Sequence, residues 1–311
     1  MKIAVTGATG FIGRALCKKL YKRCEVVALT RSKQRAKTIF DDSIKIVEWN
    51  GRDGGEWEDC INGCDAIVNL AGANVASGRW SQKRKEDILQ SRLNTIYALR
   101  DAIDKANKKP KVFVQASAIG FYKSQSEEML DENSEGGEGF LAKVCQEVEK
   151  ATEEIESSGI RLVIIRTSVV LGSGGGALPQ MIQPFKFYVG GYPGSGRQWM
   201  SWISLEDEIA AIQYLLEHNQ LNGVFNLTSP NPVINRDFFK TLGRVLGRPC
   251  WLPVPEIALK IFFGEMVDEL FFSSQKVYPK RLLDEGYEFR YPDLQNDLNI
   301  IVKKGADDEF S

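Results

Sequence analysis

Residues 2–13, KIAVTGATGFIG, place an apolar strand-like run, a glycine-rich turn and the start of an amphipathic segment in direct succession. In this context a glycine pattern predicts a dinucleotide-binding turn. Gly7 allows a tight turn, Gly10 lets the backbone approach a pyrophosphate, and Gly13 lets the helix pack closely on the strand. The first N–H groups of the helix would then bind the phosphates. The residues expected around the phosphates are Gly7, Thr9, Gly10, Phe11, Ile12 and Gly13.

The spacing of these glycines, GxxGxxG, has one residue more in its first gap than the common GxGxxG pattern. A glycine turn with a purely structural role is therefore the alternative to a binding site. The strand before the turn and the helix after it favour the binding site.

The end of the second expected strand indicates which dinucleotide is bound. A site for NAD normally has an acidic residue about 20 residues beyond the glycines, where it binds the ribose 2′-hydroxyl. This sequence has Arg31 there, with Lys33 and Arg35 close behind. A guanidinium can pair with a 2′-phosphate, which a carboxylate would repel. We therefore predict NADP(H) rather than NAD(H), with a surface cation at the strand end as the alternative.

The first half of the chain alternates β-branched runs with amphipathic stretches, which predicts parallel strands connected by helices. The expected strands are 3–6, 25–29, 44–48, 66–70, 112–115 and 162–166, and the expected helices are 12–23, 82–105 and 141–157. We predict an α/β fold, a Rossmann doubly wound parallel sheet over residues 1–172, with a smaller C-terminal α/β lobe over residues 173–311. Residues 202–226 resume the strand–helix–strand pattern and are expected to return to the sheet.

The composition is that of an ordinary globular protein, with 43% hydrophobic residues and a net charge of -1. This balance gives no reason to expect nucleic acid or an anionic membrane as a partner. The N-terminus lacks a signal-peptide core and the six cysteines are scattered, so we expect reduced thiols and a cytoplasmic location. The one histidine, His218, lies in a helical run next to Asn219, so we expect neither a Ser-His-Asp triad nor a metal site. A small-molecule substrate would lie between the lobes, and a homodimer is compatible with the sequence.

Several further segments resemble one family along nearly the whole chain. They are AIVNLAGAN (66–74), GRWSQKRKEDILQSRLNT (78–95), IRTSVVLGSGGGAL from residue 165, and GSGRQWMSWISLED (194–207). The stretches FNLTSPNPVINRDFFKTLGRVLGRPCWLPVP, GEMVDEL and YPKRLLDEGYEFRYP are similar to that family's own C-terminal domain. Together with the glycine turn, they resemble the atypical extended short-chain dehydrogenases/reductases. Within that group they are most similar to the epimerase family proteins, which are sugar-nucleotide-epimerase-like.

The resemblance implies roles for residues around an NADP(H) cofactor. It places Leu70, Ala71 and Gly72 beside the adenosine, and Thr30 and Arg31 at the 2′-phosphate. It places Asp87 and Arg92 on a helix that reaches the dinucleotide. Lys143 would lie at the nicotinamide ribose, Val170 beside the nicotinamide, and Asn94 in a proton relay. For the helix, a solvated ion pair between Asp87 and Arg92 is the alternative.

The residues that usually carry the chemistry in this superfamily are missing. Its ordinary members use a tyrosine as general acid/base, a lysine four residues later, and a serine or threonine. Lys143 is present here, but Gly139 stands four residues before it, beside Phe140, and the usual serine position holds Ala118. Moving a hydride to or from an alcohol carbon needs a matched proton transfer, which neither Gly139 nor Phe140 can provide.

Three interpretations remain open. Tyr122 could supply the proton with help from Ser117, or Glu206 or Asp207 could supply it, or the site binds NADP(H) without turning over an alcohol. The predicted catalytic residues are Tyr122, Ser117, Lys143 and Asn94. We expect an NADP(H)-dependent oxidoreductase or epimerase that acts on a small polar molecule such as a nucleotide sugar. A non-catalytic NADP(H)-binding redox sensor or scaffold is the alternative.

Overall fold

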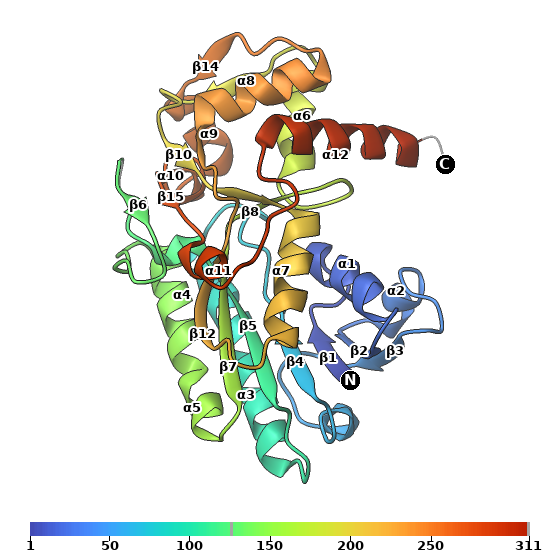
Figure 1. Ribbon diagram of the computed structural model, residues 1–311. Coiled ribbons are helices and arrows are strands. Elements are labelled where there is room, and N and C mark those ends of the chain that lie inside the picture. Colours follow the sequence, from blue (N-terminus) through green and yellow to red (C-terminus); the bar gives the residue numbers. More distant parts are fainter. Residues whose placement is uncertain (125–126, 310–311) are drawn as a thin grey trace.

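A seven-stranded parallel sheet forms the centre of the structure, a computed structural model that describes residues 1–124 and 127–309 (Figure 1). The strand order is β12-β7-β5-β4-β1-β2-β3. The strands are β1 (Lys2–Thr6), β2 (Glu25–Thr30), β3 (Lys45–Glu48), β4 (Ala66–Asn69), β5 (Val112–Ala118), β7 (Arg161–Thr167) and β12 (Gly223–Leu227). The order reverses between β1 and β4, and ligands of such sheets bind at the carboxyl ends of the strands at this point. The predicted Rossmann fold class is confirmed.

Helices cover both faces of this sheet. On one face α1 (Phe11–Leu20) packs against α7 (Leu205–Glu217), and on the other α3 (Gln82–Lys105) packs against α4 (Phe140–Ala151). Each face has its own apolar core, with Leu16 and Ile212 in the first and Ile96 and Val148 in the second. Because both faces are buried, the central strands are almost wholly apolar. The shorter connecting elements are α2 (Lys33–Lys37), η1 (Glu56–Cys60) and η2 (Ile119–Phe121).

The helix expected over residues 141–157 is two helices, α4 and α5 (Glu153–Ser157). The break falls at Thr152, whose hydroxyl donates a hydrogen bond to the carbonyl oxygen of Glu149 (2.6 Å). A threonine hydroxyl bonded to the preceding turn competes with the regular helical pattern. The apolar periodicity continues from α4 into α5, so the sequence pattern did not indicate the break.

Short elements make up the smaller lobe (Figure 1). Its strands form pairs: β8 (Val169–Leu171) with β11 (Trp202–Ser204), β9 (Gly191–Pro193) with β14 (Leu252–Val254), β10 (Trp199–Met200) with β13 (Val233–Ile234), and β6 (Met129–Leu130) with β15 (Lys276–Val277). Its helices are α6 (Leu178–Lys186), α8 (Asn235–Leu246), α9 (Glu256–Phe263), α10 (Met266–Leu270) and α12 (Leu294–Glu309), whereas α11 (Lys280–Asp284) packs against β12 of the central sheet. Trp202, Phe238 and Leu298 lie in its core. Within the described ranges, no helix has the length and apolar character needed to cross a membrane.

The glycine-rich segment after β8 packs around the ring of Phe11. A Cβ atom at Gly175 would lie 2.5 Å from this ring, so no larger residue fits there without movement. The Arg14 side chain also donates a hydrogen bond to the carbonyl oxygen of Gly174. These contacts join the start of the smaller lobe to the N-terminal turn of α1.

Glu208 on α7 is buried against the end of β7. Its Oε1 atom accepts a hydrogen bond from the Thr167 hydroxyl (2.8 Å), and its Oε2 atom has no partner among the described residues. Burial raises the pKa of this carboxyl from 4.5 to about 8. The folded chain therefore keeps Glu208 largely protonated in neutral solution.

Stability should fall as the pH rises from about 5 to 8, because the unfolded chain ionises Glu208 in this range and the folded chain does not. Glu208→Gln cannot ionise. When the pH is raised from 5.5 to 8, the free energy of unfolding of the wild-type protein should fall by about 2–3 kcal/mol more than that of this variant. Urea unfolding at both pH values measures this difference, with Glu217→Gln, an exposed residue at the far end of α7, as the control. Equal pH dependence of the wild-type protein and Glu208→Gln would contradict the shifted pKa.

Candidate functional site

The turn between β1 and α1 is held by close backbone contacts that only glycine permits. Gly7 has a φ of +62°, and a Cβ atom on it would lie 2.7 Å from the carbonyl oxygen of Leu70. A Cβ atom at Gly13 would lie 2.3 Å from the Gly7 carbonyl oxygen. The Gly10 N–H donates to that same oxygen (2.9 Å) and closes the turn. The three glycines thus bring the start of α1 directly against the end of β1.

No described side chain caps the N-terminus of α1, whose N-cap residue is Gly10. The first turn of a helix has N–H groups without partners inside the helix, and its dipole attracts negative charge. Thr9, Phe11 and Ile12 are half-buried around this turn, and Gly13 is buried. The arrangement fits a diphosphate, because it offers backbone donors and room for a close approach.

The end of β2 places Arg31 beside this turn, since β1 and β2 are paired through Thr6 and Leu29. Arg31 is exposed, and it lines a cavity of about 420 Å³ together with Trp49, Asn50 and the acids Glu48, Asp53 and Glu56. Thr30 accepts a hydrogen bond from the backbone N–H of Ser32 (3.3 Å) and so fixes the backbone that follows Arg31. No acidic side chain in the described ranges forms an ion pair with Arg31, and its guanidinium is available to an external anion.

At the end of β4 the backbone of Leu70–Gly72 lies between β1 and α3. The Thr6 hydroxyl donates to Asn69 Oδ1 (2.5 Å) and accepts a hydrogen bond from the Ala71 N–H (3.2 Å). A Cβ atom at Gly72 would lie 2.9 Å from Cζ of Arg92. The glycine there is what lets the Arg92 side chain reach the strand end.

The predicted alternative for α3, an ion pair between Asp87 and Arg92, is not formed. Asp87 is exposed, whereas Arg92 is half-buried and donates to the carbonyl oxygens of Ile88 (2.8 Å) and Ala73 (3.2 Å). Burial lowers the pKa of the Arg92 guanidinium. A cation without a carboxylate partner at this edge of the sheet favours an anionic ligand.

The Tyr122 hydroxyl is bound inside the protein, although the residue lines the pocket described below. The side chain is 2% exposed, its hydroxyl donates to Asn226 Oδ1 (2.7 Å), and it accepts a hydrogen bond from Arg166 Nη1 (3.0 Å). Burial raises the pKa of Tyr122 to about 12. Ser117, the expected helper, donates its hydroxyl to Glu149 Oε1 (2.7 Å). This geometry disfavours both residues as proton donors.

Arg166 and Glu149 form the buried ion pair at the centre of this network. Two hydrogen bonds join them, from Arg166 Nε to Oε1 (2.9 Å) and from Nη2 to Oε2 (2.8 Å). The ring of Phe121 lies 3.4 Å from Cζ of Arg166. The pair connects α4 to the ends of β5 and β7. Sequence reasoning missed it, although an arginine in an otherwise apolar strand was a signal.

The other predicted residues are spread around this edge of the sheet. Lys143 is exposed one turn into α4, and Asn94 is half-buried on α3. Val170 is buried in β8, next to the segment that packs on Phe11. Asp207, offered above as a proton donor, accepts hydrogen bonds from the backbone of Arg290 and Tyr291 and serves to hold that segment.

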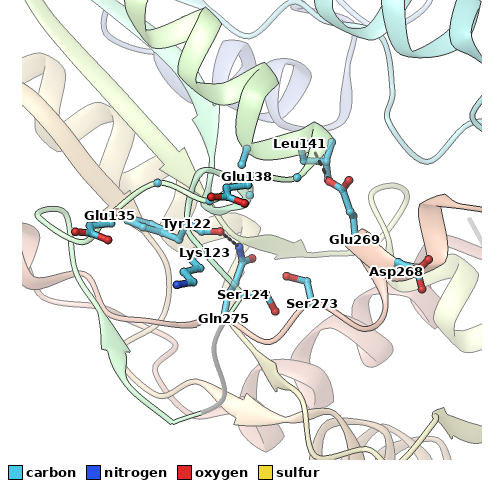
Figure 2. Close-up of a pocket in the computed structure, with 15 residues that line it drawn as sticks. Tyr122, Lys123, Ser124, Glu135, Glu138, Leu141, Asp268, Glu269, Ser273 and Gln275 are labelled. Atoms are coloured by element: carbon cyan, nitrogen blue, oxygen red, sulfur yellow. Dashed lines mark hydrogen bonds between the residues drawn. The ribbon is translucent and has the colours of Figure 1, made fainter.

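A pocket of about 440 Å³ lies where the N-terminus of α4 meets α10 of the smaller lobe (Figure 2). Its charged lining residues are four acids and one base: Glu135, Glu138, Asp268, Glu269 and Lys123. Polar Ser124, Ser273 and Gln275 also line it. The lining of the pocket is therefore polar, with more acidic than basic side chains.

Glu269 of α10 lies beside Gly139, the position at which the superfamily usually has its tyrosine. Its carboxylate accepts hydrogen bonds from the backbone N–H groups of Phe140 (2.8 Å) and Leu141 (2.7 Å), at the first turn of α4. A Cβ atom at Gly139 would lie 3.2 Å from Cδ of Glu269. Figure 2 shows this side chain extending from α10 toward Leu141 at the start of α4. Sequence reasoning missed Glu269, whose only signal was an acidic pair in the segment GEMVDEL.

Comparison with known families accounts for most of the chain. Residues 3–228 match the NAD dependent epimerase/dehydratase family, and residues 254–299 match a domain of unknown function, DUF1731. The chain is 40% identical to the chloroplastic epimerase family protein SDR39U1 homolog of Arabidopsis thaliana, covering 97% of this chain and 87% of that protein. It is also 40% identical to the epimerase family protein YfhF of Bacillus subtilis, covering 97% and 98%.

Among solved structures, the human epimerase family protein SDR39U1 (isoform 2), crystallised with NADPH, matches with a TM-score of 0.87. The two are 33% identical, and the match covers 97% of this chain and 99% of that one. These findings confirm the resemblance seen in the sequence segments. The chain belongs to the NAD-dependent epimerase/dehydratase family, as an epimerase family protein of the SDR39U1 type.

Proposed function

We propose that this protein binds NADP(H) and acts as an oxidoreductase or epimerase on a small polar molecule. The observation that carries the proposal is the uncapped start of α1, held against β1 by Gly7 and Gly13, with Arg31 at the neighbouring strand end. The NADPH in the structure of the human relative supports the same choice of cofactor here.

The chain's own residues would share the work of holding this cofactor. The turn at residues 7–13 would bind the diphosphate, Arg31 the 2′-phosphate, and the backbone of Leu70 and Ala71 the adenosine. Arg92 would add positive charge beside the diphosphate, and Val170 would border the nicotinamide. When bound, NADP(H) supplies or accepts a hydride.

The charge of the pocket in Figure 2 supports a substrate without phosphate groups. Four carboxylates and one amine line it, and a nucleoside diphosphate would bring further negative charge into the same space. Like charges inside one pocket repel each other, and the repulsion is stronger in a partly enclosed site than in water. A neutral or cationic polar molecule, such as a sugar or an amino sugar, suits the pocket better than a nucleotide sugar.

Glu269 is the group we propose for the proton transfer. It lines the pocket at the start of α4 and stands beside Gly139, where the usual tyrosine is missing. As a carboxylate it can accept the proton of a substrate hydroxyl while the hydride leaves the carbon that carries this hydroxyl. In the reverse direction it would return the proton to the oxygen of the reduced carbonyl.

A second function, NADP(H) binding without turnover, is favoured by a separate observation. The hydroxyls of Tyr122 and Ser117 are both bound inside the protein, and Glu269 already accepts two backbone hydrogen bonds. A protein with this arrangement could sense the NADP(H) pool or serve as a scaffold.

Reversing the charge at Arg31 tests the choice of cofactor. Arg31→Glu should weaken NADPH binding by about 1–3 kcal/mol, roughly 5- to 150-fold, because a charge-assisted pair with the 2′-phosphate is lost. Calorimetric titration measures it, and binding of NADH should change much less. Lys37→Glu at the far end of α2 makes the same charge change and serves as the control. Equal affinity of the wild-type protein for NADH and NADPH would refute the role of Arg31.

Replacing Glu269 and Tyr122 separately tests the source of the proton. In an assay of NADPH oxidation with aldehydes, ketosugars and amino sugars, Glu269→Gln should lower the rate by about 10²–10⁴-fold, the usual contribution of a general acid/base. Its affinity for NADPH should stay unchanged. Tyr122→Phe should keep the activity but lose about 1–3 kcal/mol of stability, because Asn226 and Arg166 lose a buried partner.

Loss of activity in Tyr122→Phe with normal activity in Glu269→Gln would reverse these assignments. If the wild-type protein binds NADPH but oxidises it with none of these substrates, the non-catalytic function is supported.

A further inference from the structure

Asp297 is an acidic residue on the apolar face of α12. Leu294, Leu298 and Ile301 of this helix lie in the core of the smaller lobe, and their spacing places them on one helical face. Asp297 lies on the same face and is 2% exposed. Its Oδ2 atom has no hydrogen-bond partner in the part of the chain that the structure describes. Burying a carboxylate without partners is costly, so the charge state of Asp297 affects how firmly α12 is held.

Two acidic residues of α7, Asp207 and Glu206, act on Asp297. The two carboxylate oxygens of Asp207 accept hydrogen bonds from the backbone N–H groups of Arg290 and Tyr291 (2.9 Å each). Burial raises the pKa of Asp207, and these hydrogen bonds act against the rise. Burial, together with the charges of Asp207 and Glu206, raises the pKa of Asp297 from 3.8 to about 7. Of the two buried carboxyls, Asp297 is therefore the one that keeps a proton.

The basic group that acts on Asp297 is Lys304, further along α12. It lowers the pKa of Asp297, but its ammonium pairs with the carboxylate of Glu206 (2.8 Å). The other titratable side chains on the neighbouring elements bind elsewhere: Arg244 of α8 binds Gln295 Oε1 (2.9 Å), Tyr287 binds the backbone oxygen of Asp207 (3.1 Å), and Glu208 of α7 binds Thr167 (2.8 Å). Loss of the Asp297 proton would thus add a second negative charge beside Asp207 in a buried site, where like charges repel strongly.

The far end of α12 reaches the glycine-rich loop beside the nucleotide turn. A Cβ atom at Gly305 would lie 3.9 Å from Cβ of Ser173. The loop that contains Ser173, residues 172–176, packs on the ring of Phe11 at the start of α1. Figure 1 shows α12 beyond the upper end of α7, on the same side of the molecule as α1. Docked α12 therefore contacts a loop that in turn contacts the nucleotide turn.

We propose that pH controls the docking of α12: the helix is docked while Asp297 keeps its proton and undocks when Asp297 ionises, and undocking frees the loop at residues 172–176. The docked helix binds one proton more than the undocked helix between about pH 4, where a free aspartate titrates, and about pH 7. Docking should weaken as the pH rises through this range, by about tenfold per pH unit at most. The docking of α12 does not rest on the proposed function, whereas any effect of it on NADP(H) binding does.

Hydrogen exchange of the full chain, followed by mass spectrometry between pH 5 and 7, tests the proposal. After division by the intrinsic exchange rate, the open fraction of residues 294–305 should rise by about 10- to 100-fold in the wild-type protein. The open fraction of residues 172–176 should rise with it. In Asp297→Asn both open fractions should stay constant over this range, because an amide does not ionise. Peptides from α3 report on the global fold and should stay protected in both proteins.

Two variants serve as controls. Glu288→Gln removes an exposed acid from the segment before α12, and Glu208→Gln removes the other buried carboxyl whose pKa is raised into the neutral range. Both should keep the wild-type rise. Should Asp297→Asn fail to fold, Asp297→Leu gives the same test, because leucine does not ionise and suits an apolar face.

An Asp297→Asn protein that opens with the same pH dependence as the wild-type protein would overturn the proposal. So would a rise that disappears in Glu208→Gln, or a rise at residues 294–305 without one at residues 172–176. Calorimetry with NADPH separates these results from the proposed function. If NADPH does not bind, the proposed function fails and the exchange data still decide the docking of α12. If NADPH binds and neither segment opens with pH, the inference about α12 fails alone.

Discussion

Three backbone segments, the turn after β1, the start of α1 and the end of β4, lie in close contact, and the site depends on this contact. The turn after β1 passes so near the carbonyl of Leu70 that a Cβ atom at Gly7 would lie 2.7 Å from its oxygen. Gly13 meets the turn even more closely. Because no side chain separates them, β1, α1 and the end of β4 share one small volume at the carboxyl edge of the sheet. The phosphate site is thus a property of the backbone, and the side chains around it set which dinucleotide fits.

A second constraint acts where β5, β7 and β12 end. The ion pair between Arg166 and Glu149 is almost wholly buried, and such a pair is tolerated only when its remaining hydrogen-bonding capacity is satisfied. Tyr122 and Ser117 help to satisfy it. The hydroxyl groups of Tyr122 and Ser117 therefore stabilise the strand ends. Glu269, which we propose for the proton transfer, reaches the start of α4 from the smaller lobe, so the proposed catalysis would require both lobes.

The sequence was informative wherever a feature depends on near neighbours in the chain. The glycine turn, the central strands and the cation at Arg31 are all local patterns, and the Rossmann fold class follows from their order. Contacts between distant segments gave no such pattern. Phe140 and Glu269 are 129 residues apart, and Tyr122 and Asn226 are 104 apart. A tyrosine near a strand end looked available for chemistry, because the sequence does not show which side chains will surround it.

The amide signals of the first helical turn test the central claim most directly. Nuclear magnetic resonance of the ¹⁵N-labelled protein can follow the N–H groups of Gly10, Phe11, Ile12 and Gly13 as NADPH is added. If these groups bind the diphosphate, their signals should shift the most and saturate at one equivalent, together with the signal of Arg31. Saturating NADPH that leaves these four amides unchanged, whether or not other signals move, would contradict the account.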